Sequence, residues 1–302
     1  MGGSSKALDM DPGIDDACAI ILSESFWGSR LRSVSTVSGN VDVQKTTINA
    51  LRIKELFGYS YKVYRGASRP LAGRLTKAAF VHGNDGLGDA GLPMPQIKEE
   101  KQTAVEALIR AAADGHDIIA TGPLTNVALL LILRPDLTNN IGSLTIMGGA
   151  FRLTETGGGN ATRFAEFNVY ADPEAADIVF SSLRHMNVVP LDLTMNPALS
   201  FRKDEIEGLP DTKGARFLRA ISARYLERFP ALVLHDAIAV DVLEHDDEYT
   251  YMSGRVGVVK QGIARGATYL MRDDEYDHRV YIAPKNNNGF KERFLSALKE
   301  LS

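Results

Sequence analysis

Short apolar runs alternate with helical patterns along most of the chain. Strands are predicted at residues 6–11, 31–37, 61–65, 117–120, 143–147 and 187–191. Helices are predicted at residues 14–25, 43–57, 103–114 and 124–133, and over much of 204–245. This alternation is typical of α/β proteins whose strands lie in one central sheet. We therefore predict a largely parallel sheet flanked by helices.

The last part of the chain has a different pattern. A small strand-rich patch covers residues 255–260, 267–271 and 279–282, and a helix from about residue 290 to 301 closes the chain. Residues 66–100 are rich in glycine, proline and polar groups, which predicts a long connection, and long connections in compact domains are often functional lids. Without an internal repeat or a clear linker, we expect residues 1–302 to form a single domain.

Composition narrows the class of protein. An apolar fraction of 44% and a charged fraction of 24% are ordinary for a soluble globular protein, and a net charge of −4 gives no general attraction for nucleic acid. Cys18 is the only cysteine, so an internal disulfide or a thiolate metal site is excluded. Since no stretch resembles a signal peptide or a membrane span, we expect a cytoplasmic protein without membrane or nucleic-acid partners.

Four aspartates are crowded near the start of the chain: Asp9, Asp11, Asp15 and Asp16. Two like charges about 4 Å apart repel by roughly 4 kcal/mol at an effective dielectric constant of about 20. A folded protein can hold such a cluster by spreading the charges, by protonating one of them or by binding a cation. The alternative interpretation is helix capping combined with ordinary surface charge.

The residues between these aspartates favour a binding site. Pro12-Gly13 predicts a sharp turn from a strand into a helix, which places Asp15 and Asp16 in the first helical turn, where the helix dipole favours carboxylates. The carboxyl ends of strands are where open α/β sheets bind ligands. Oxygen-only ligands suit a hard divalent cation such as Ca²⁺ or Mg²⁺.

The run from Asp9 to Ala17 closely resembles the N-terminal motif of the nucleoside hydrolases, Ca²⁺-dependent enzymes that cut the N-glycosidic bond of ribonucleosides. Further segments resemble the same family in the same order. They are Gly39-Asn40, Thr121-Gly122-Pro123-Leu124-Thr125-Asn126, Met147-Gly148-Gly149, Asn160 to Asn168, Asp172 to Ala176, Leu191-Asp192-Leu193-Thr194 and His235-Asp236. Pro190 departs from the pattern, which often has glycine there, and the first strand is poor in β-branched residues.

The resemblance implies a set of metal ligands and a reaction. Ca²⁺ is expected on Asp11, Asp16, the carbonyl of Thr121 and Asp236. Asp11 is also expected to act as the general base on a water that attacks C1′ of the ribose with inversion. His235 occupies the position of a general acid for the leaving base. Asp9 is expected to orient other carboxylates.

The resemblance also implies which residues bind the substrate. Asp15 and Asn168 would bind the ribose hydroxyls, and Asn40 would support that site. Asn160 and Glu166 would bind the 5′ and 3′ side of the sugar. The residues expected at the sugar or base are Met147, Phe167 and His82, with Tyr225 and Phe229 as further aromatic contacts. The residue types alone suggest other roles. Asn160 would be a turn residue, and Met147 and Phe167 would be core residues. His82 would be a surface loop residue, His235 would be structural, and Asp236 would be a helix cap.

The sequence does not determine which base is preferred, and inosine, uridine, cytidine, adenosine and a modified riboside all remain candidate substrates. His235 and His82 favour the inosine–uridine type, whereas Trp27, the only tryptophan, excludes a pair of tryptophans around a purine. Two other functions remain. Asp9-Met10-Asp11 resembles the nucleophile pair of haloacid-dehalogenase-like phosphatases, although Gly13 stands where those enzymes have Thr or Val. The third possibility is a non-catalytic protein that binds ribose or Ca²⁺. A homodimer or homotetramer is expected from the resemblance.

Overall fold

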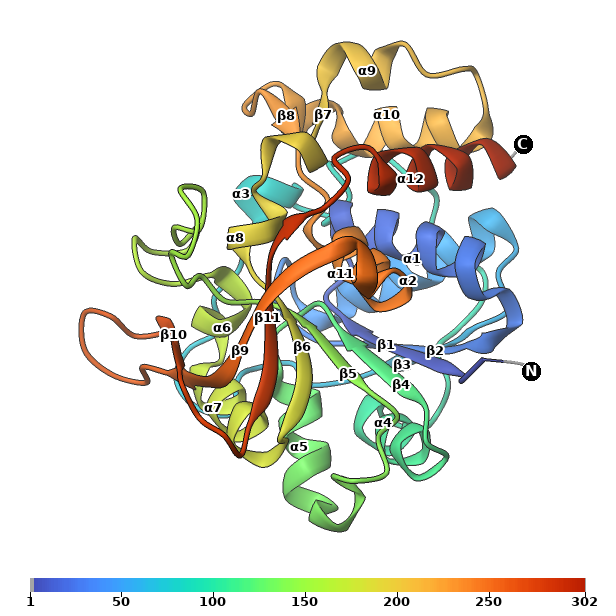
Figure 1. The fold of residues 1–302 in the computed structure, drawn as a ribbon. Helices are drawn as coiled ribbons and strands as arrows, with labels where there is room; N and C mark the ends of the chain where they lie inside the picture. Colours follow the sequence, from blue (N-terminus) through green and yellow to red (C-terminus); the bar gives the residue numbers. More distant parts are fainter. Residues whose placement is uncertain (1–2, 302) are drawn as a thin grey trace.

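The computed structural model describes residues 3–301, and its centre is one nine-stranded sheet (Figure 1). The strand order is β10-β9-β11-β6-β5-β4-β1-β2-β3. The strands are β1 (Lys6–Met10), β2 (Leu31–Thr36), β3 (Lys62–Arg65), β4 (Asp117–Ala120), β5 (Leu144–Met147), β6 (His185–Val189), β9 (Tyr249–Val258), β10 (Thr268–Met271) and β11 (Asp277–Pro284). Strands β7 (Phe201–Arg202) and β8 (Ala231–Leu232) form a separate antiparallel pair.

The topology creates a crevice next to the first strand. Strands β3, β2, β1, β4, β5, β6 and β11 are parallel, and at one edge β9 pairs antiparallel with both β11 and β10. The chain runs outward from β1 through β2 to β3 and then returns to β4 on the other side of β1. Such a reversal of strand order opens a crevice at the carboxyl ends of the two central strands.

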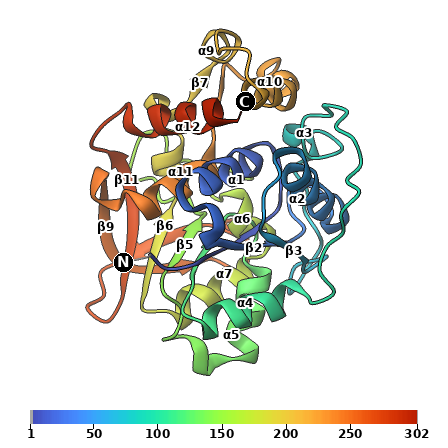
Figure 2. The same ribbon diagram turned by 90° about the vertical axis from the view of Figure 1, so that its right-hand side faces the viewer.

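Helices cover both faces of the sheet, as Figures 1 and 2 show. Neighbouring residues of β1 face opposite layers, with Leu8 in the core beneath α1 and Ala7 in the core beneath α4. Because both layers pack on the same sheet, we infer that residues 3–301 form one domain. The first layer contains α1 (Ile14–Trp27), α2 (Val43–Phe57), α10 (Lys213–Leu226), α11 (His235–Glu244) and α12 (Gly289–Glu300), and the second α4 (Ala104–Ala113), α5 (Thr125–Leu133) and α7 (Pro173–Ser182).

The predicted fold class is confirmed, and the differences are local. The predicted strand-rich patch near the C-terminus joins the central sheet, because β11 pairs in parallel with β6. Lys6 is buried in β1 because its ammonium group lies 2.5 Å from Asp117. Helices that the sequence patterns did not indicate are α3 (Ala79–His82), α6 (Phe167–Ala171), α7 and α8 (Leu191–Thr194), whereas α9 (Lys203–Glu207) lies at the start of the region 204–245 that was predicted to be largely helical. Within residues 3–301, no helix is both long and apolar enough to cross a membrane.

A buried ion pair joins α12 to α11. The side chain of Asp241 is fully buried and accepts hydrogen bonds from Arg293, at 2.7 Å from Nε and 2.6 Å from Nη2. The Tyr249 hydroxyl donates to the same carboxylate at 2.5 Å. Every oxygen of Asp241 is therefore paired, and the pairing depends mainly on Arg293.

We predict that Arg293→Met lowers the free energy of unfolding by about 3–5 kcal/mol, because it leaves the Asp241 carboxylate buried without its cation. Urea unfolding measures the change. The control is Lys203→Met, which removes an exposed ion pair to Glu207 and is expected to cost about 1 kcal/mol or less. Equal losses in the two variants would contradict the prediction.

Candidate active site

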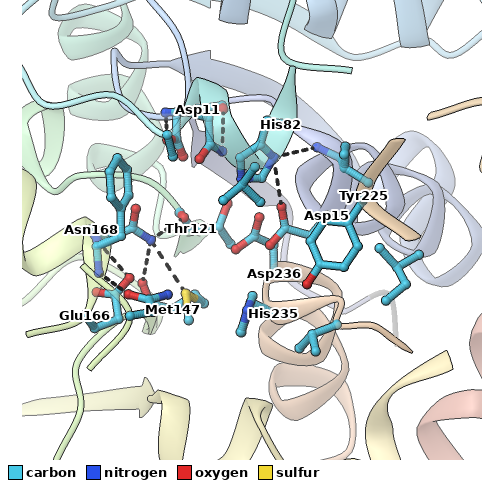
Figure 3. A pocket seen from close by; sticks show the side chains of 18 of the residues that line it. Asp11, Asp15, His82, Thr121, Met147, Glu166, Asn168, Tyr225, His235 and Asp236 are labelled. Atoms are coloured by element: carbon cyan, nitrogen blue, oxygen red, sulfur yellow. Dashed lines mark hydrogen bonds and ion pairs between the residues drawn. The ribbon is translucent and has the colours of Figure 1, made fainter. Parts of the chain in front are cut away.

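A cavity of about 250 Å³ lies at the carboxyl ends of β1, β4 and β5 (Figure 3). It occupies the crevice where the strand order reverses, so the sheet topology decides its position. Residues named in the sequence analysis that line it are Asp11, Asp15, Asn40, His82, Thr121, Met147, Asn160, Glu166, Phe167, Asn168, Tyr225, Phe229, His235 and Asp236. Asp16, which the resemblance makes a metal ligand, does not line the cavity, because it is fully buried and accepts a hydrogen bond from the lining residue Thr121.

One wall of the cavity is acidic. Asp15 and Asp16 lie in the first turn of α1, and Asp236 lies in the first turn of α11. Each of the three offers a carboxylate oxygen within 4.8 Å of the others. Asp11 follows β1 and lies close enough for its charge to raise the pKa of Asp236. The positive ends of two helix dipoles therefore face this cluster, which favours carboxylates there.

Asn40 and Gly13 hold two of these carboxylates in place. The Asn40 backbone N–H donates to Asp11 Oδ2 at 2.6 Å, and its side-chain amide donates to Asp16 Oδ2 at 3.1 Å. The Gly13 N–H donates to the same Asp16 oxygen at 2.8 Å, and the Thr121 hydroxyl donates to Asp16 Oδ1 at 3.2 Å. Asn40 thus orients Asp11 and Asp16 relative to each other.

Two glycines make room for Asp11. A Cβ atom on Gly39 would lie 2.0 Å from Asp11 Oδ2, and a Cβ atom on Gly122 would lie 2.8 Å from Asp11 Oδ1. Atoms that close would displace the carboxylate. The presence of glycine in Gly39-Asn40 and in Thr121-Gly122 therefore has a steric reason at this site.

The acidic cluster is short of positive charge. Burial, together with neighbouring carboxylates, raises the pKa of Asp15 to about 8 and the pKa values of Asp11 and Asp236 well above their usual range. Burial also raises the pKa of Asp16 to about 6. Among residues 3–301, neither Lys nor Arg forms an ion pair with these four residues, and Asp15 Oδ1 is buried without a hydrogen-bond partner. This oxygen-rich donor set fits a hard divalent cation.

The opposite wall comes from β4, β5 and α6. The Asn168 side-chain amide donates to the carbonyls of Thr121 at 2.7 Å and Met147 at 3.2 Å, so it fixes the ends of two neighbouring strands. Glu166 caps α6 and accepts backbone hydrogen bonds from Asn168, Val169 and Gly149. Burial raises the pKa of Glu166 to about 7.

Asn160 lies at the rim of the cavity. Its Oδ1 accepts from the Phe167 N–H at 2.8 Å, so Asn160 ties its loop to the first turn of α6. This contact matches the turn role that the residue type alone suggested. The side chain is exposed and also lines the cavity, so its amide NH₂ group is available to a ligand.

Two histidines flank the remaining side. His82, at the end of α3, accepts the Ile14 N–H at 3.2 Å through Nδ1, and this nitrogen lies 3.9 Å from Asp15 Oδ1. His235, at the start of α11, has Nδ1 2.7 Å from the Thr194 hydroxyl. Desolvation by burial lowers the pKa of His82 to about 3 and the pKa of His235 to about 4. Both rings are therefore neutral at pH 7 in the metal-free protein.

The space next to the histidines is apolar. The rings of Tyr225 and Phe229 lie against each other with centroids 4.5 Å apart. Further lining residues, which the sequence analysis did not identify as site residues, are Ile14, Ala78, Phe80, Val81, Met195, Leu232 and Val233. Apolar residues in a sequence do not by themselves indicate a binding site, so only the fold shows that these residues line the cavity.

Two residues from the sequence analysis lie outside the cavity. Trp27 is buried in the core and donates through Nε1 to Glu244, so it does not contact a ligand in this cavity. Asp9 lies within β1, where one carboxylate oxygen accepts from Asn126 at 2.8 Å and the other has no hydrogen-bond partner within residues 3–301. Burial raises the pKa of Asp9 to about 7.

Comparison with known proteins agrees with this arrangement. Residues 7–292 match the family model described as inosine-uridine preferring nucleoside hydrolase. Uridine nucleosidase 1 of Arabidopsis thaliana is 35% identical over 277 residues, covering 87% of this chain and 80% of the relative. The pyrimidine-specific ribonucleoside hydrolase RihA of Shigella flexneri is 35% identical over 307 aligned positions, covering 97% of each.

Solved structures give the same result. A plant nucleoside hydrolase superposes with a TM-score of 0.86 at 31% identity, and the alignment covers 98% of both chains. A purine-preferring ribonucleoside hydrolase from Gardnerella vaginalis gives a TM-score of 0.88 at 29% identity with the same coverage. The shared fold, the family match and the relatives together show that this chain belongs to the nucleoside hydrolase family, whose members cleave the N-glycosidic bond of nucleosides.

Proposed function

We propose that this protein hydrolyses ribonucleosides to ribose and free base, with Ca²⁺ held by Asp11, Asp16, Asp236 and the carbonyl of Thr121. The observation that carries this proposal is the buried carboxylate cluster, which lacks a cationic side chain among the described residues. Asp15 belongs to the same cluster, so it lies where it can bind the ion or the ribose hydroxyls beside it. A bound divalent cation supplies a water of lowered pKa and a fixed position for the sugar.

Asp11 is the proposed general base. Its position is fixed by the Asn40 N–H and by the tight space left by Gly39 and Gly122. In the reaction, Asp11 accepts a proton from the attacking water while a C–O bond forms at C1′ and the C1′–N bond breaks. The transition state resembles an oxocarbenium ion, and attack from the face opposite the base gives inversion.

The ribose would lie between the acidic wall and the wall of α6. Asp15 and Asn168 are proposed to bind its 2′- and 3′-hydroxyls, and Asn160 and Glu166 its remaining polar groups. Support comes from their common position around the cavity and from the fixed orientation of Asn168. Met147 and Phe167 line the same part of the cavity and would contact the sugar ring.

The base would enter the apolar part of the cavity, between the Tyr225–Phe229 pair and the two histidines. His235 is the proposed partner of the leaving base, and His82 would close the cavity from α3. We propose uridine as a substrate, supported by relatives described as a uridine nucleosidase and a pyrimidine-specific hydrolase. Assembly as a homodimer or homotetramer stays a prediction.

The first experiment measures base release from inosine, uridine, cytidine and adenosine, with added Ca²⁺ and with a Ca²⁺ chelator. We expect hydrolysis that the chelator abolishes and that Ca²⁺ restores, with uridine among the substrates. A folded, Ca²⁺-loaded protein that releases no base would instead support the non-catalytic binding protein. Release of phosphate from a chromogenic phosphate ester would support the phosphatase alternative.

Asp11→Ala and Asp11→Asn are both expected to lower kcat by about a thousandfold or more, because they remove the general base and a proposed ligand. Circular dichroism and the melting temperature establish that the fold is retained. Asp136→Asn, at an exposed position paired with Arg134, is the matched control and should keep normal activity. Near-normal turnover by well-folded Asp11→Ala would exclude the proposed mechanism.

Ca²⁺ should stabilise the protein more at pH 8 than at pH 6.5. The pKa of Asp15 rises from 3.8 to about 8 in the folded state, so the metal-free folded form binds more protons than the unfolded form, and its stability falls as pH rises. His82 and His235 have lowered pKa values and oppose this trend while their unfolded imidazoles still bind protons, an effect that fades above about pH 7. Between pH 6.5 and 8, each carboxylate whose pKa is raised in this way lowers the free energy of unfolding of the metal-free protein by up to about 1.4 kcal/mol per pH unit.

Denaturant unfolding at several pH values, with chelator or with Ca²⁺, measures this effect. In the metal-free protein, Asp15→Asn should reduce the fall of the free energy of unfolding with rising pH, whereas Asp136→Asn should leave that fall unchanged. A metal-free stability that stays level or increases from pH 6.5 to 8 would contradict the expected charge state of the cluster.

A further inference from the structure

None of the residues of the short helix α8 lines the cavity. Figure 1 shows where this helix lies in the fold. It follows β6 directly, at the same edge of the sheet as the cavity. Thr194, its last residue, is fully buried, and its hydroxyl lies 2.7 Å from His235 Nδ1. The last residue of the motif Leu191-Asp192-Leu193-Thr194 thus places its hydroxyl against the ring of His235. The reaction proposed above assigns no role to this hydroxyl.

Hydrogen-bond satisfaction decides which of the two groups donates. Among residues 3–301, the Thr194 hydroxyl has no hydrogen-bond partner other than His235 Nδ1. If Nδ1 carried the proton, the hydroxyl would accept it and its own buried proton would have no acceptor, which costs free energy. If the hydroxyl donates to Nδ1, both groups are satisfied.

We propose that Thr194 is a positioning residue that keeps His235 in the neutral tautomer with its proton on Nε2, so that Nε2–H donates a hydrogen bond to the departing base. This inference rests on the proposed function. Nε2 has no protein partner among the described residues, and His235 lines the cavity, so Nε2–H is free to meet a ligand there. In Figure 3 the ring of His235 lies beside the acidic wall, below Asp236.

The tautomer determines what His235 does in the reaction. When the C1′–N bond breaks, its electron pair moves onto the base and negative charge develops on the ring and its carbonyl oxygens. An N–H fixed at that position stabilises the charge as it develops. His235 keeps its proton in this step, because a neutral imidazole that gave it up would become an anion. The proton taken from water stays on Asp11.

The support behind Thr194 is rigid. The Thr194 N–H bonds to the carbonyl of Pro190 at 3.0 Å, which closes the turn of α8. Asp192, in the same helix, accepts the N–H groups of Phe151 at 2.8 Å and Leu153 at 2.6 Å. These hydrogen bonds fix the backbone that carries the Thr194 side chain, and His235 Nδ1 is the contact of its hydroxyl.

Nuclear magnetic resonance of ¹⁵N-histidine protein, loaded with Ca²⁺, reads the tautomer directly. The His235 signals are assigned with His235→Gln among the six histidines of the chain. We expect the proton on Nε2 in the natural protein and in Thr194→Ser, and a loss of this single tautomer in Thr194→Val, which has the same shape without the hydroxyl. A proton on Nδ1 in the natural protein would overturn the proposal.

Kinetics with two different leaving groups tests whether the Nε2–H group of His235 stabilises the departing base. Thr194→Val should lower kcat for uridine by about tenfold or more, with KM nearly unchanged. The same variant should lose little with p-nitrophenyl riboside, since p-nitrophenolate leaves without such help, and Thr194→Ser should resemble the natural protein on both. An equal loss on the two substrates would mean that Thr194 has only a structural role, and this also overturns the proposal.

These outcomes are distinct from a failure of the proposed function. If the natural, Ca²⁺-loaded protein hydrolyses neither uridine nor the chromogenic riboside, the proposed function is wrong. The tautomer measurement still applies in that case, because it requires only the folded protein.

Discussion

Mutual repulsion between buried carboxylates is the constraint on which this site depends. Asp11, Asp15, Asp16 and Asp236 are drawn together from two strand–helix junctions far apart in the sequence, and burial makes their charges costly. The surroundings offset this cost in three ways: two helix N-termini face the cluster, backbone and amide N–H groups donate to it, and an oxygen-rich space remains for a cation. The packing of α1 against α11 brings these features together.

Much of the fold and the polar half of the site could be predicted from the sequence. The strand and helix patterns are strong because β1, β4 and β5 are buried on both faces, and a buried parallel strand reads as a short apolar run. The polar residues could be assigned because carboxylates and amides in unusual groups indicate chemistry, and because the motifs resemble those of one family. One more helix could have been predicted from the sequence. Asp172 followed by Pro173 is a helix-start signal that indicates α7.

Other parts could not be predicted, for physical reasons. The apolar residues that would face the base, such as Val81 and Val233, look like any core residue until the chain is folded. The partner of His235 is equally hidden, because Thr194 lies 41 residues away and the motif Leu191-Asp192-Leu193-Thr194 does not indicate which side chain its hydroxyl contacts. The join between the C-terminal strands and the main sheet depends on pairing of β11 with β6, a long-range register that local patterns do not contain.

The polar and the apolar sides of the cavity include residues close in the sequence, such as Val233 and Asp236, but they depend on different contacts. Around Asp11 the backbone of Gly39 and Gly122 leaves no space for even one additional methyl group. The apolar side is built from α3 and from the end of α10 with the segment after it, whose side chains contact the rest of the site through few polar groups. A change of bulk or shape among these apolar side chains would therefore alter the cavity without moving Asp11 or the glycines around it.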